Sequence, residues 1–292
     1  MAVQKPAQLT IQSTITAFSE YLSGKAVDSP RLSAELVLRK ILGISRLDIL
    51  INSNREVSTE AYAEMEKLIL RRGTGEPAAY IMGEREFYGR PFHVNSHTLI
   101  PRPETEHLIE AVVERFAHKG AFRFADLGTG SGCIATTIAA ELPEAFGVAV
   151  DLSEGAITTA KQNIHDNQVA DRVACIRADF TTPLFKNNTF DLIATNPPYV
   201  SQSEYIKLDP EVQQFEPSSA LVPGTSGLEH GIPLIELASV WLKPSGFFIM
   251  EMGFWQGADL MKEFYKKPDI WCKPAIIKDL SGHDRFVCGY KA

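Results

Sequence analysis

Up to about residue 75 the apolar positions recur every three or four residues, the spacing that places side chains on one face of a helix. The first run follows Ser29-Pro30, an N-cap residue with proline at the first helical position, and stops before Gly43. The second starts near Ser58 and closes with Arg71-Arg72, at the end where the helix dipole favours bases. The two apolar faces consist of Leu32, Leu36, Val37 and Ile41, and of Tyr62, Met65, Leu68 and Ile69. This pattern predicts a small bundle of amphipathic helices.

From about residue 105 short apolar runs alternate with helical stretches. We predict strands at Phe122–Leu127, Phe146–Val150, Arg172–Arg177, Phe190–Thr195, Phe247–Met252, Ala275–Lys278 and Arg285–Tyr290. We predict helices at Cys133–Glu141, Ser153–Asn167, Ile232–Leu242 and Gln256–Lys266. Strands that alternate with helices indicate an α/β fold with a parallel, doubly wound sheet.

The stretch between these two regions has the features of a connection. Residues 86–94 are typical of a β-hairpin with Gly89 near its turn. Pro101 and Pro103 then exclude a helix and stiffen the chain. We therefore predict a helical domain at residues 1–82, followed at residues 83–292 by a hairpin linker and the α/β domain.

The net charge of −7 argues against a protein whose whole surface binds nucleic acid. The charge is uneven, since residues 1–75 hold ten basic and eight acidic residues and the remainder nineteen and twenty-eight. No apolar run approaches the roughly 20 residues that span a bilayer, and the N-terminus lacks the pattern of a signal peptide. The cysteines form no CxxC pair of the kind that binds metal. We expect a cytoplasmic monomer without metal that binds neither a membrane nor, stably, a nucleic acid.

A glycine-rich loop, Gly128-Thr129-Gly130-Ser131-Gly132, lies between a predicted strand and a predicted helix. Its glycines let the backbone turn sharply and let a ligand approach without a Cβ in the way. The loop is not a P-loop, because no lysine follows, and Cys133 stands where a dinucleotide site prefers Gly or Ala. A tight turn between strand and helix is the alternative interpretation.

The second predicted strand is followed by Asp151. An acid at this strand end can accept hydrogen bonds from both ribose hydroxyls of an adenosine. With the glycine loop it resembles the S-adenosylmethionine (SAM) binding pattern of class I methyltransferases, and a helix-capping acid is the alternative. SAM carries no phosphate, which agrees with the missing lysine.

Asn196-Pro197-Pro198-Tyr199 follows the fourth predicted strand, so it is expected to face the same crevice as the glycine loop. The Asn196 side-chain oxygen and the Pro197 carbonyl can each accept one N–H of a substrate NH2 group. Two acceptors orient a weakly nucleophilic amide or amino nitrogen toward a methyl donor and stabilise its growing positive charge. The prolines hold the carbonyl rigidly, and the Tyr199 ring can cover a flat group. No strong base is needed, so we expect all seven histidines to be surface or core residues.

Further segments carry a resemblance to one family. They are Gly75–Gly83, Glu86–Gly89, Leu99–Glu106, Phe215–Pro217, Ala220-Leu221, Gly227-Leu228, Glu251–Gly253, Gln256-Gly257 and Asp279–Arg285. With the glycine loop and the tetrapeptide they resemble the HemK/PrmC family, the glutamine N5-methyltransferases of peptide chain release factors. The resemblance covers residues 75–292 strongly and the N-terminal helices weakly.

This resemblance implies a class I SAM-dependent methyltransferase fold with a seven-stranded, mostly parallel sheet, joined by a hairpin to a small N-terminal helical bundle. It implies that Gly128–Gly132 contact SAM, with S-adenosylhomocysteine as product, that Asp151 binds the ribose, and that Asn196, Pro197, Pro198 and Tyr199 bind the glutamine of the Gly-Gly-Gln loop. The resemblance also implies that Asn196 contacts the cofactor. Phe180 stands where the family commonly has Trp; it is expected to stack near the adenine, with an ordinary core position as the alternative.

Two other functions remain open at this point. A DNA or RNA amino-methyltransferase uses the same tetrapeptide, but such an enzyme needs a basic surface, and this chain is acidic with an extra domain of a size suited to docking a protein. A SAM-binding module without catalysis is disfavoured because the tetrapeptide is intact. We therefore expect transfer of methyl from SAM to the glutamine of release factors, with the helical domain docking that protein.

Overall fold

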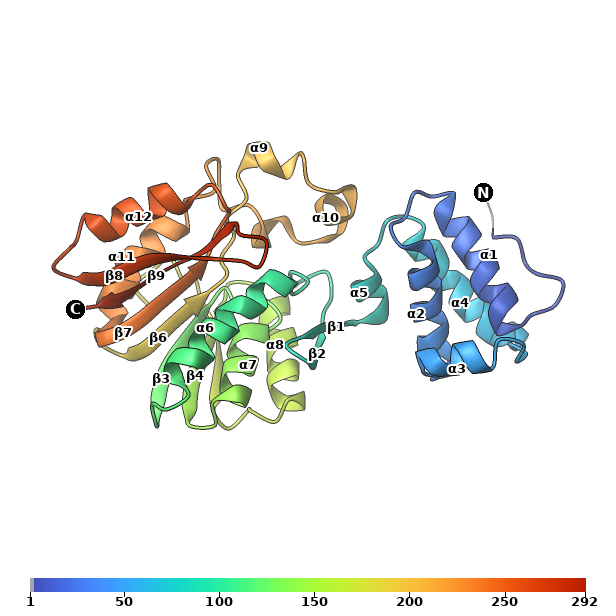
Figure 1. The fold of residues 1–292 in the computed structure, drawn as a ribbon, viewed down its shortest axis with the longest axis horizontal. Coiled ribbons are helices and arrows are strands. Elements are labelled where there is room, and N and C mark those ends of the chain that lie inside the picture. Colours follow the sequence, from blue (N-terminus) through green and yellow to red (C-terminus); the bar gives the residue numbers. More distant parts are fainter. Residues whose placement is uncertain (1–2) are drawn as a thin grey trace. The chain divides into compact units, whose positions relative to one another are not determined.

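The helical pattern of the first 75 residues folds into a bundle with a core of its own. The computed structural model describes residues 3–292, which divide into two units (Figure 1). The first contains the described chain up to Gly83 together with Asp209–Phe215, and the second contains Glu84–Leu208 together with Glu216–Ala292. The segment Asp209–Phe215 lies outside the range that the sequence assigned to the helical domain.

The first unit is helical throughout. Its helices are α1 (Ile11–Ser23), α2 (Pro30–Leu42), α3 (Arg46–Ile51), α4 (Thr59–Arg72), α5 (Ala78–Met82) and α10 (Pro210–Phe215). The two predicted helices, α2 and α4, are confirmed. Ser58 caps α4 by accepting the Ala61 N–H, whereas Ser29 has a left-handed backbone and makes no capping bond. Phe18 of α1 and Tyr62 of α4 meet in the core with ring centroids 5.1 Å apart.

The predicted hairpin opens the second unit. Strands β1 (Glu84–Phe87) and β2 (Arg90–His93) pair antiparallel through a turn at Tyr88-Gly89. The connection that follows differs from the prediction, because Pro103–Thr105 forms a 3₁₀ turn, η1, that leads directly into helix α6 (Glu106–Phe116). Proline is tolerated there because it stands at the first position of the turn, where its missing N–H is not needed.

A seven-stranded sheet follows, and all seven predicted strands are present. They are β3 (Phe122–Leu127), β4 (Ala145–Asp151), β5 (Val173–Arg177), β6 (Phe190–Thr195), β7 (Leu242–Glu251), β8 (Trp271–Lys278) and β9 (Asp284–Lys291). Their order is β5-β4-β3-β6-β7-β9-β8; β9 pairs antiparallel with β7 and β8, and all the other pairs are parallel. The predicted class I fold with a mostly parallel sheet is confirmed.

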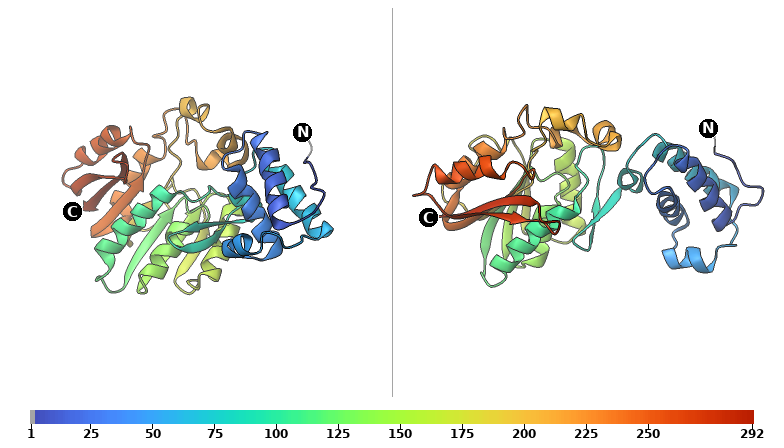
Figure 2. Two further views of the ribbon diagram at one scale, coloured as in Figure 1. Left: turned by 45° about the vertical axis from the view of Figure 1, so that its right-hand side comes forward. Right: turned by 45° about the horizontal axis from the view of Figure 1, so that its top comes forward.

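Helices cover both faces of this sheet. Besides α6, this unit contains α7 (Cys133–Glu141), α8 (Glu154–Asp166), α9 (Gln202–Tyr205), α11 (Gly231–Trp241) and α12 (Gly257–Tyr265), with a second 3₁₀ turn, η2 (Ser218–Ala220). Figures 1 and 2 show α6, α7 and α8 on one face and α11 and α12 on the other. Alternate strand residues feed the two layers, so that Phe124 packs under α7 while Leu127 packs toward α11. A sheet buried on both faces leaves its strand ends as the place for a site.

The carboxyl ends of β3, β4 and β6 meet at one edge of the sheet. β3 leads into the glycine loop, β4 ends at Asp151, and β6 leads into Asn196. The side-chain hydroxyl of Thr195 donates to the carbonyl of Leu127, which ties the last residues of β6 and β3 together. Within residues 3–292 no helix has the length and apolar character needed to cross a membrane.

Candidate active site

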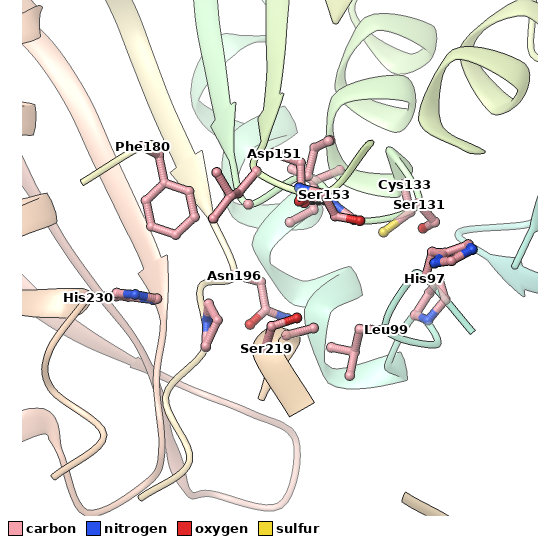
Figure 3. A pocket seen from close by; sticks show the side chains of 18 of the residues that line it. His97, Leu99, Ser131, Cys133, Asp151, Ser153, Phe180, Asn196, Ser219 and His230 are labelled. Atoms are coloured by element: carbon pink, nitrogen blue, oxygen red, sulfur yellow. Dashed lines mark hydrogen bonds between the residues drawn. The ribbon is translucent and has the colours of Figure 1, made fainter. Parts of the chain in front are cut away.

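A cavity of about 350 Å³ opens at this edge of the sheet (Figure 3). Its volume falls within the range of small-molecule sites. Eight residues singled out from the sequence line it, namely Gly128, Thr129, Gly130, Ser131, Asp151, Phe180, Asn196 and Pro198. The structure thus brings the glycine loop, the strand-end acid and the tetrapeptide to one place.

Three of the predicted site residues lie outside the lining of this cavity. Gly132, the last residue of the loop, packs against α8, where an added Cβ would come within 3.1 Å of Ala160. Pro197 is buried, and Tyr199 lines a second, small cavity together with Glu251 and Gln256. Cover of a substrate by the Tyr199 ring therefore stays a prediction.

The glycine loop owes its shape to positive φ angles. Gly128, Gly130 and Gly132 have φ of 76°, 54° and 81°, a region that side chains other than glycine rarely adopt. The N–H groups of Gly128 and Thr129 both donate to the carbonyl of Val150, at 2.9 Å each. The loop is therefore anchored to the end of β4 and presents a nearly bare backbone to the cavity.

Asp151 joins the loop to the start of α8. One carboxylate oxygen accepts the N–H of Gly130 and the other accepts the N–H of Ser153, both at 2.9 Å. Burial raises the pKa of Asp151, while these backbone bonds act in the opposite direction. Each carboxylate oxygen has a second lone pair, so the side chain retains acceptor capacity toward the cavity that it lines.

A second carboxylate lies under the same loop. Asp126 is completely buried, and one of its oxygens accepts the Thr129 hydroxyl at 2.6 Å and the Ala135 N–H at 3.1 Å. Burial raises its pKa to about 7. The sequence placed Asp126 at the end of a strand but assigned it no role, because neither partner is visible in a local pattern.

Asn196 is held by residues from two distant parts of the chain. Its Nδ2 donates to the hydroxyl of Thr105 at 3.1 Å, and that hydroxyl donates to Glu251 Oε2 at 2.6 Å. The Tyr199 hydroxyl donates to the other oxygen of Glu251 at 3.1 Å. Glu251 is buried, and burial raises its pKa despite the opposing effects of the Thr105 hydroxyl and of Arg285. Burial and the nearby Glu251 raise the pKa of Tyr199 as well.

The backbone beyond the tetrapeptide is fixed by Gln256. Its side-chain nitrogen donates to the carbonyls of Tyr199 and Gly227, and its side-chain oxygen accepts the Gly253 N–H. Both N–H groups and the oxygen of this buried side-chain amide are thus hydrogen-bonded to the main chain. Tyr199 is therefore held at both its hydroxyl and its carbonyl.

Two segments that carried the family resemblance meet beside the cavity. Arg102, which lines the cavity, donates to Glu216 at 2.7 Å, and the same buried carboxylate accepts the N–H of Ile100 at 3.1 Å. An ion pair with one fully buried partner and a second hydrogen bond is well satisfied. This contact fixes one wall of the cavity.

Phe180 is both a core residue and a cavity residue, so each of the two interpretations left open by the sequence holds in part. It packs in the core, and it also lines the cavity, where its ring approaches Gly128. His230 meets it edge to face, with ring centroids 5.3 Å apart, and both lie on the same side of Asn196 in Figure 3.

His230 corrects the expectation that every histidine is a surface or core residue. It lines the cavity, and its buried Nδ1 has no hydrogen-bond partner among the described residues. Burial lowers its pKa, which favours the neutral ring, although Asp179 opposes this. Its ring therefore borders the cavity while one of its nitrogens is buried and unpaired. No motif marks it in the sequence.

The described part of the chain contains no set of side chains arranged to bind a metal ion. No group of three or more His, Cys, Asp or Glu side chains there has the arrangement needed to hold a metal ion. The polar groups at the cavity are instead hydrogen-bond acceptors and donors, which suits an organic ligand.

Comparison with known proteins matches both units of the chain. The family model described as the PrmC N-terminal domain matches residues 13–83, and the one described as the methyltransferase small domain matches residues 103–212. A protein of Nitratidesulfovibrio vulgaris named release factor glutamine methyltransferase is 47% identical, over 95% of this chain and 94% of its own. A protein of the same name from Koribacter versatilis is 39% identical, over 97% and 99% of the two chains.

Among solved structures, the catalytic domain of hMettl16 in complex with MAT2A 3'UTR hairpin 1 superposes with a TM-score of 0.59. The match covers 94% of this chain and 91% of the other at 15% identity. At that identity the likeness concerns the fold alone.

Proposed function

The chain belongs to the family of release factor glutamine methyltransferases, and from this premise we propose that it transfers a methyl group from SAM to a release factor. The acceptor is the side-chain amide nitrogen, N5, of the glutamine in the Gly-Gly-Gln motif. The observation that carries this proposal is the position of Asn196 in the cavity that the glycine loop and Asp151 also line.

The residues at the cavity fit SAM. The three glycines of the loop offer backbone without side chains, Asp151 offers carboxylate lone pairs suited to ribose hydroxyls, and Phe180 offers an aromatic ring suited to the adenine. When bound, SAM supplies an electrophilic methyl group on a sulfonium and leaves as S-adenosylhomocysteine.

Asn196 and Pro197 act on the substrate amide. The Asn196 oxygen and the Pro197 carbonyl each accept one N–H of the glutamine NH2, which holds the nitrogen with its lone-pair face toward the methyl group. The same acceptors stabilise the positive charge that grows on nitrogen as the new bond forms. One N–H proton leaves to water afterwards, so the chain need not supply a strong base. Tyr199, Pro197 and Pro198 keep this part of the chain rigid.

No residue of the described part of the helical unit lines the cavity, and we assign to this unit the docking of the release factor. A substrate of protein size offers contacts far from the reacting glutamine. Binding energy from such contacts can be used to position the reacting nitrogen.

The experiment that tests the proposed function compares three acceptors in parallel. Labelled methyl from SAM is offered to a purified release factor, to DNA and to RNA, with Asn196→Ala as the matched control. We expect label in the release factor alone, on its Gly-Gly-Gln glutamine, and a turnover about 10²–10³ lower with Asn196→Ala because one positioned electrostatic contact is lost. Label in DNA or RNA but not in the release factor would instead support a nucleic acid amino-methyltransferase.

A further inference from the structure

Behind Asn196 lies a buried carboxylate that the reaction itself does not use. We propose that Glu251, acting through the hydroxyl of Thr105, is a positioning residue that turns the Asn196 side chain so that its oxygen faces the substrate. This inference rests on the proposed function, since it explains how the acceptor for the glutamine N–H is presented.

The three side chains form a line from the core to the cavity. Asn196 and Thr105 both line the cavity, whereas Glu251 does not and lies behind them. Asn196 Nδ2 is 3.1 Å from Thr105 Oγ1, which is 2.6 Å from Glu251 Oε2. Thr105 and Glu251 are 2% and 1% exposed, so water does not compete for the bond between them, whereas Asn196 is half-buried at the cavity.

The chemistry of the groups gives this line a direction. An ionised carboxylate can only accept hydrogen bonds, and a hydroxyl has a single proton to donate. Because Thr105 gives its proton to Glu251, only its lone pairs remain for Asn196. Those lone pairs attract the NH2 end of the Asn196 amide and repel the oxygen end. The amide oxygen is therefore the end that turns away from Thr105.

The opposite orientation would have nearly the same shape but the wrong polarity. With the amide reversed, Asn196 would present N–H groups to the NH2 of a glutamine, and two donors cannot pair. Packing alone does not separate these orientations, because the amide oxygen and nitrogen are similar in size. The carboxylate at the buried end of the line makes the distinction.

The surroundings of Glu251 hold the carboxylate in this role. The Tyr199 hydroxyl donates to its second oxygen at 3.1 Å, and Arg285 stabilises its charge, while Glu104 acts against it. Arg285 is itself fixed by Asp279, to which it donates two hydrogen bonds of 3.0 and 3.2 Å. One buried carboxylate thus orients both Asn196 and the Tyr199 hydroxyl.

The first test uses two variants of the middle residue in the full-length chain. Thr105→Val keeps the shape and removes the hydroxyl, whereas Thr105→Ser keeps the hydroxyl. We expect Thr105→Val to lower kcat for methyl transfer to the release factor about 10–100-fold and to change the affinity for SAM less than about twofold. Thr105→Ser is expected to stay within about threefold of the parent chain. Equal kcat for Thr105→Val and the parent would overturn the inference.

A double-variant comparison separates orientation from structural damage. In Asn196→Ala there is no amide left to orient, so adding Thr105→Val should slow the enzyme no further. A further loss similar to that of Thr105→Val alone would mean that Thr105 acts elsewhere and would overturn the inference. In Glu251→Gln the new amide can donate to the Thr105 hydroxyl, which reverses the direction of the hydrogen bonds toward Asn196. This variant is therefore expected to slow transfer at least as much as Thr105→Val.

A third readout does not depend on the substrate. In the free protein the Asn196 side-chain NH2 protons, observed by NMR, should exchange with water at least about fivefold faster in Thr105→Val and at the parent rate in Thr105→Ser. Unchanged exchange in Thr105→Val would overturn the inference. If the parent chain transfers no methyl to a release factor, the proposed function fails, and this measurement still decides whether Thr105 holds the Asn196 amide.

Discussion

At the scale of single residues, the buried carboxylate of Asp126 under the glycine loop makes the stability of the protein depend on pH. Its pKa is raised to about 7 by burial, whereas an aspartate in an unfolded chain titrates near ~3.9. Between these values the folded protein holds a proton that the unfolded chain has lost. The free energy of unfolding therefore falls as pH rises from about 4 to 7, by at most about 1.4 kcal/mol per pH unit for this one group.

We expect Asp126→Asn to remove this contribution, since asparagine keeps an oxygen that can accept from Thr129 and Ala135 but does not ionise. The measurement is the difference in thermal midpoint between the variant and the parent chain at pH 5 and at pH 8. The thermal midpoint of the variant minus that of the parent should be larger at pH 8 than at pH 5. Asp171→Asn removes an exposed acid and serves as the control. The same difference at both pH values would contradict the pKa assigned to Asp126.

Only some of the residues of the site could be predicted from the sequence. The glycine loop, Asp151 and Asn196 were found because each stands at a fixed place after a strand, and strand ends converge in a parallel sheet. Thr105 and Glu251 lie 146 positions apart, and a local sequence pattern cannot predict a contact over that distance along the chain. His230 was missed for the same reason, since its place beside Phe180 depends on where α11 begins.

At the scale of elements, the turn before α11 is fitted closely against the tetrapeptide. Gly227 has φ of 82°, and an added Cβ would lie 2.4 Å from the Tyr199 carbonyl oxygen and 2.8 Å from Gln256 Nε2. A backbone atom cannot move aside cheaply, and Gln256 bonds to both carbonyls. Any side chain at Gly227 must therefore displace Tyr199.

The prediction compares two glycines with the same backbone angle. Gly282, between β8 and β9, also has φ of 82°, but an added Cβ would meet nothing within 4 Å. Both Gly227→Ala and Gly282→Ala incur a backbone cost of about 1 kcal/mol, which lowers the thermal midpoint by a few degrees. Only Gly227→Ala is expected to lower kcat as well, about 10–100-fold, because it shifts the chain that carries Asn196. Thermal melting and methyl-transfer kinetics check this; a normal kcat in Gly227→Ala would contradict it.

Elements with strong local signals were predicted closely. The strands β3 and β6 and helix α7 have the predicted bounds, because each is a buried apolar run. β7 begins at Leu242 rather than Phe247, because the strand continues through residues 243–246, which the sequence analysis left between a predicted helix and a predicted strand and where the pairing with β6 is irregular. Helices α9 and α10 were missed because four or six residues are too few to show a helical period.

At the scale of the whole molecule, the sequence predicted two regions, and the described chain divides into two units with different bounds. The change of rhythm near residue 75 marked the end of the predicted bundle, and the short helix α5 (Ala78–Met82) follows it. The assignment of Asp209–Phe215 to the helical unit could not be predicted, because it rests on contacts between distant positions, of which the pair formed by Arg72 is one. That side chain is 5% exposed and pairs with Glu211 at 2.6 Å, 139 positions further along the chain.

The docking role proposed for the helical unit predicts a difference between two substrates. Deletion of residues 1–75 removes most of this unit, and Glu211→Gln is added because Glu211 would otherwise keep a charge without Arg72. We expect affinity for SAM to stay near that of the parent, since all residues that line the cavity remain. Transfer to the full release factor should fall at least about tenfold more than transfer to a short Gly-Gly-Gln peptide, which never had the remote contacts.

The ratio of the two rates, rather than either rate, carries this prediction. Damage to the chain around residues 209–215, which follows the tetrapeptide, slows both substrates together and leaves their ratio unchanged, because both react at Asn196. Loss of docking affects only the substrate large enough to reach the helical unit. The full-length Glu211→Gln variant is the matched control: it lacks the ion pair with Arg72 but retains the unit, so its ratio should equal that of the parent. A deletion variant that binds SAM and keeps the parent ratio would show that the release factor is recognised by the sheet-containing unit alone.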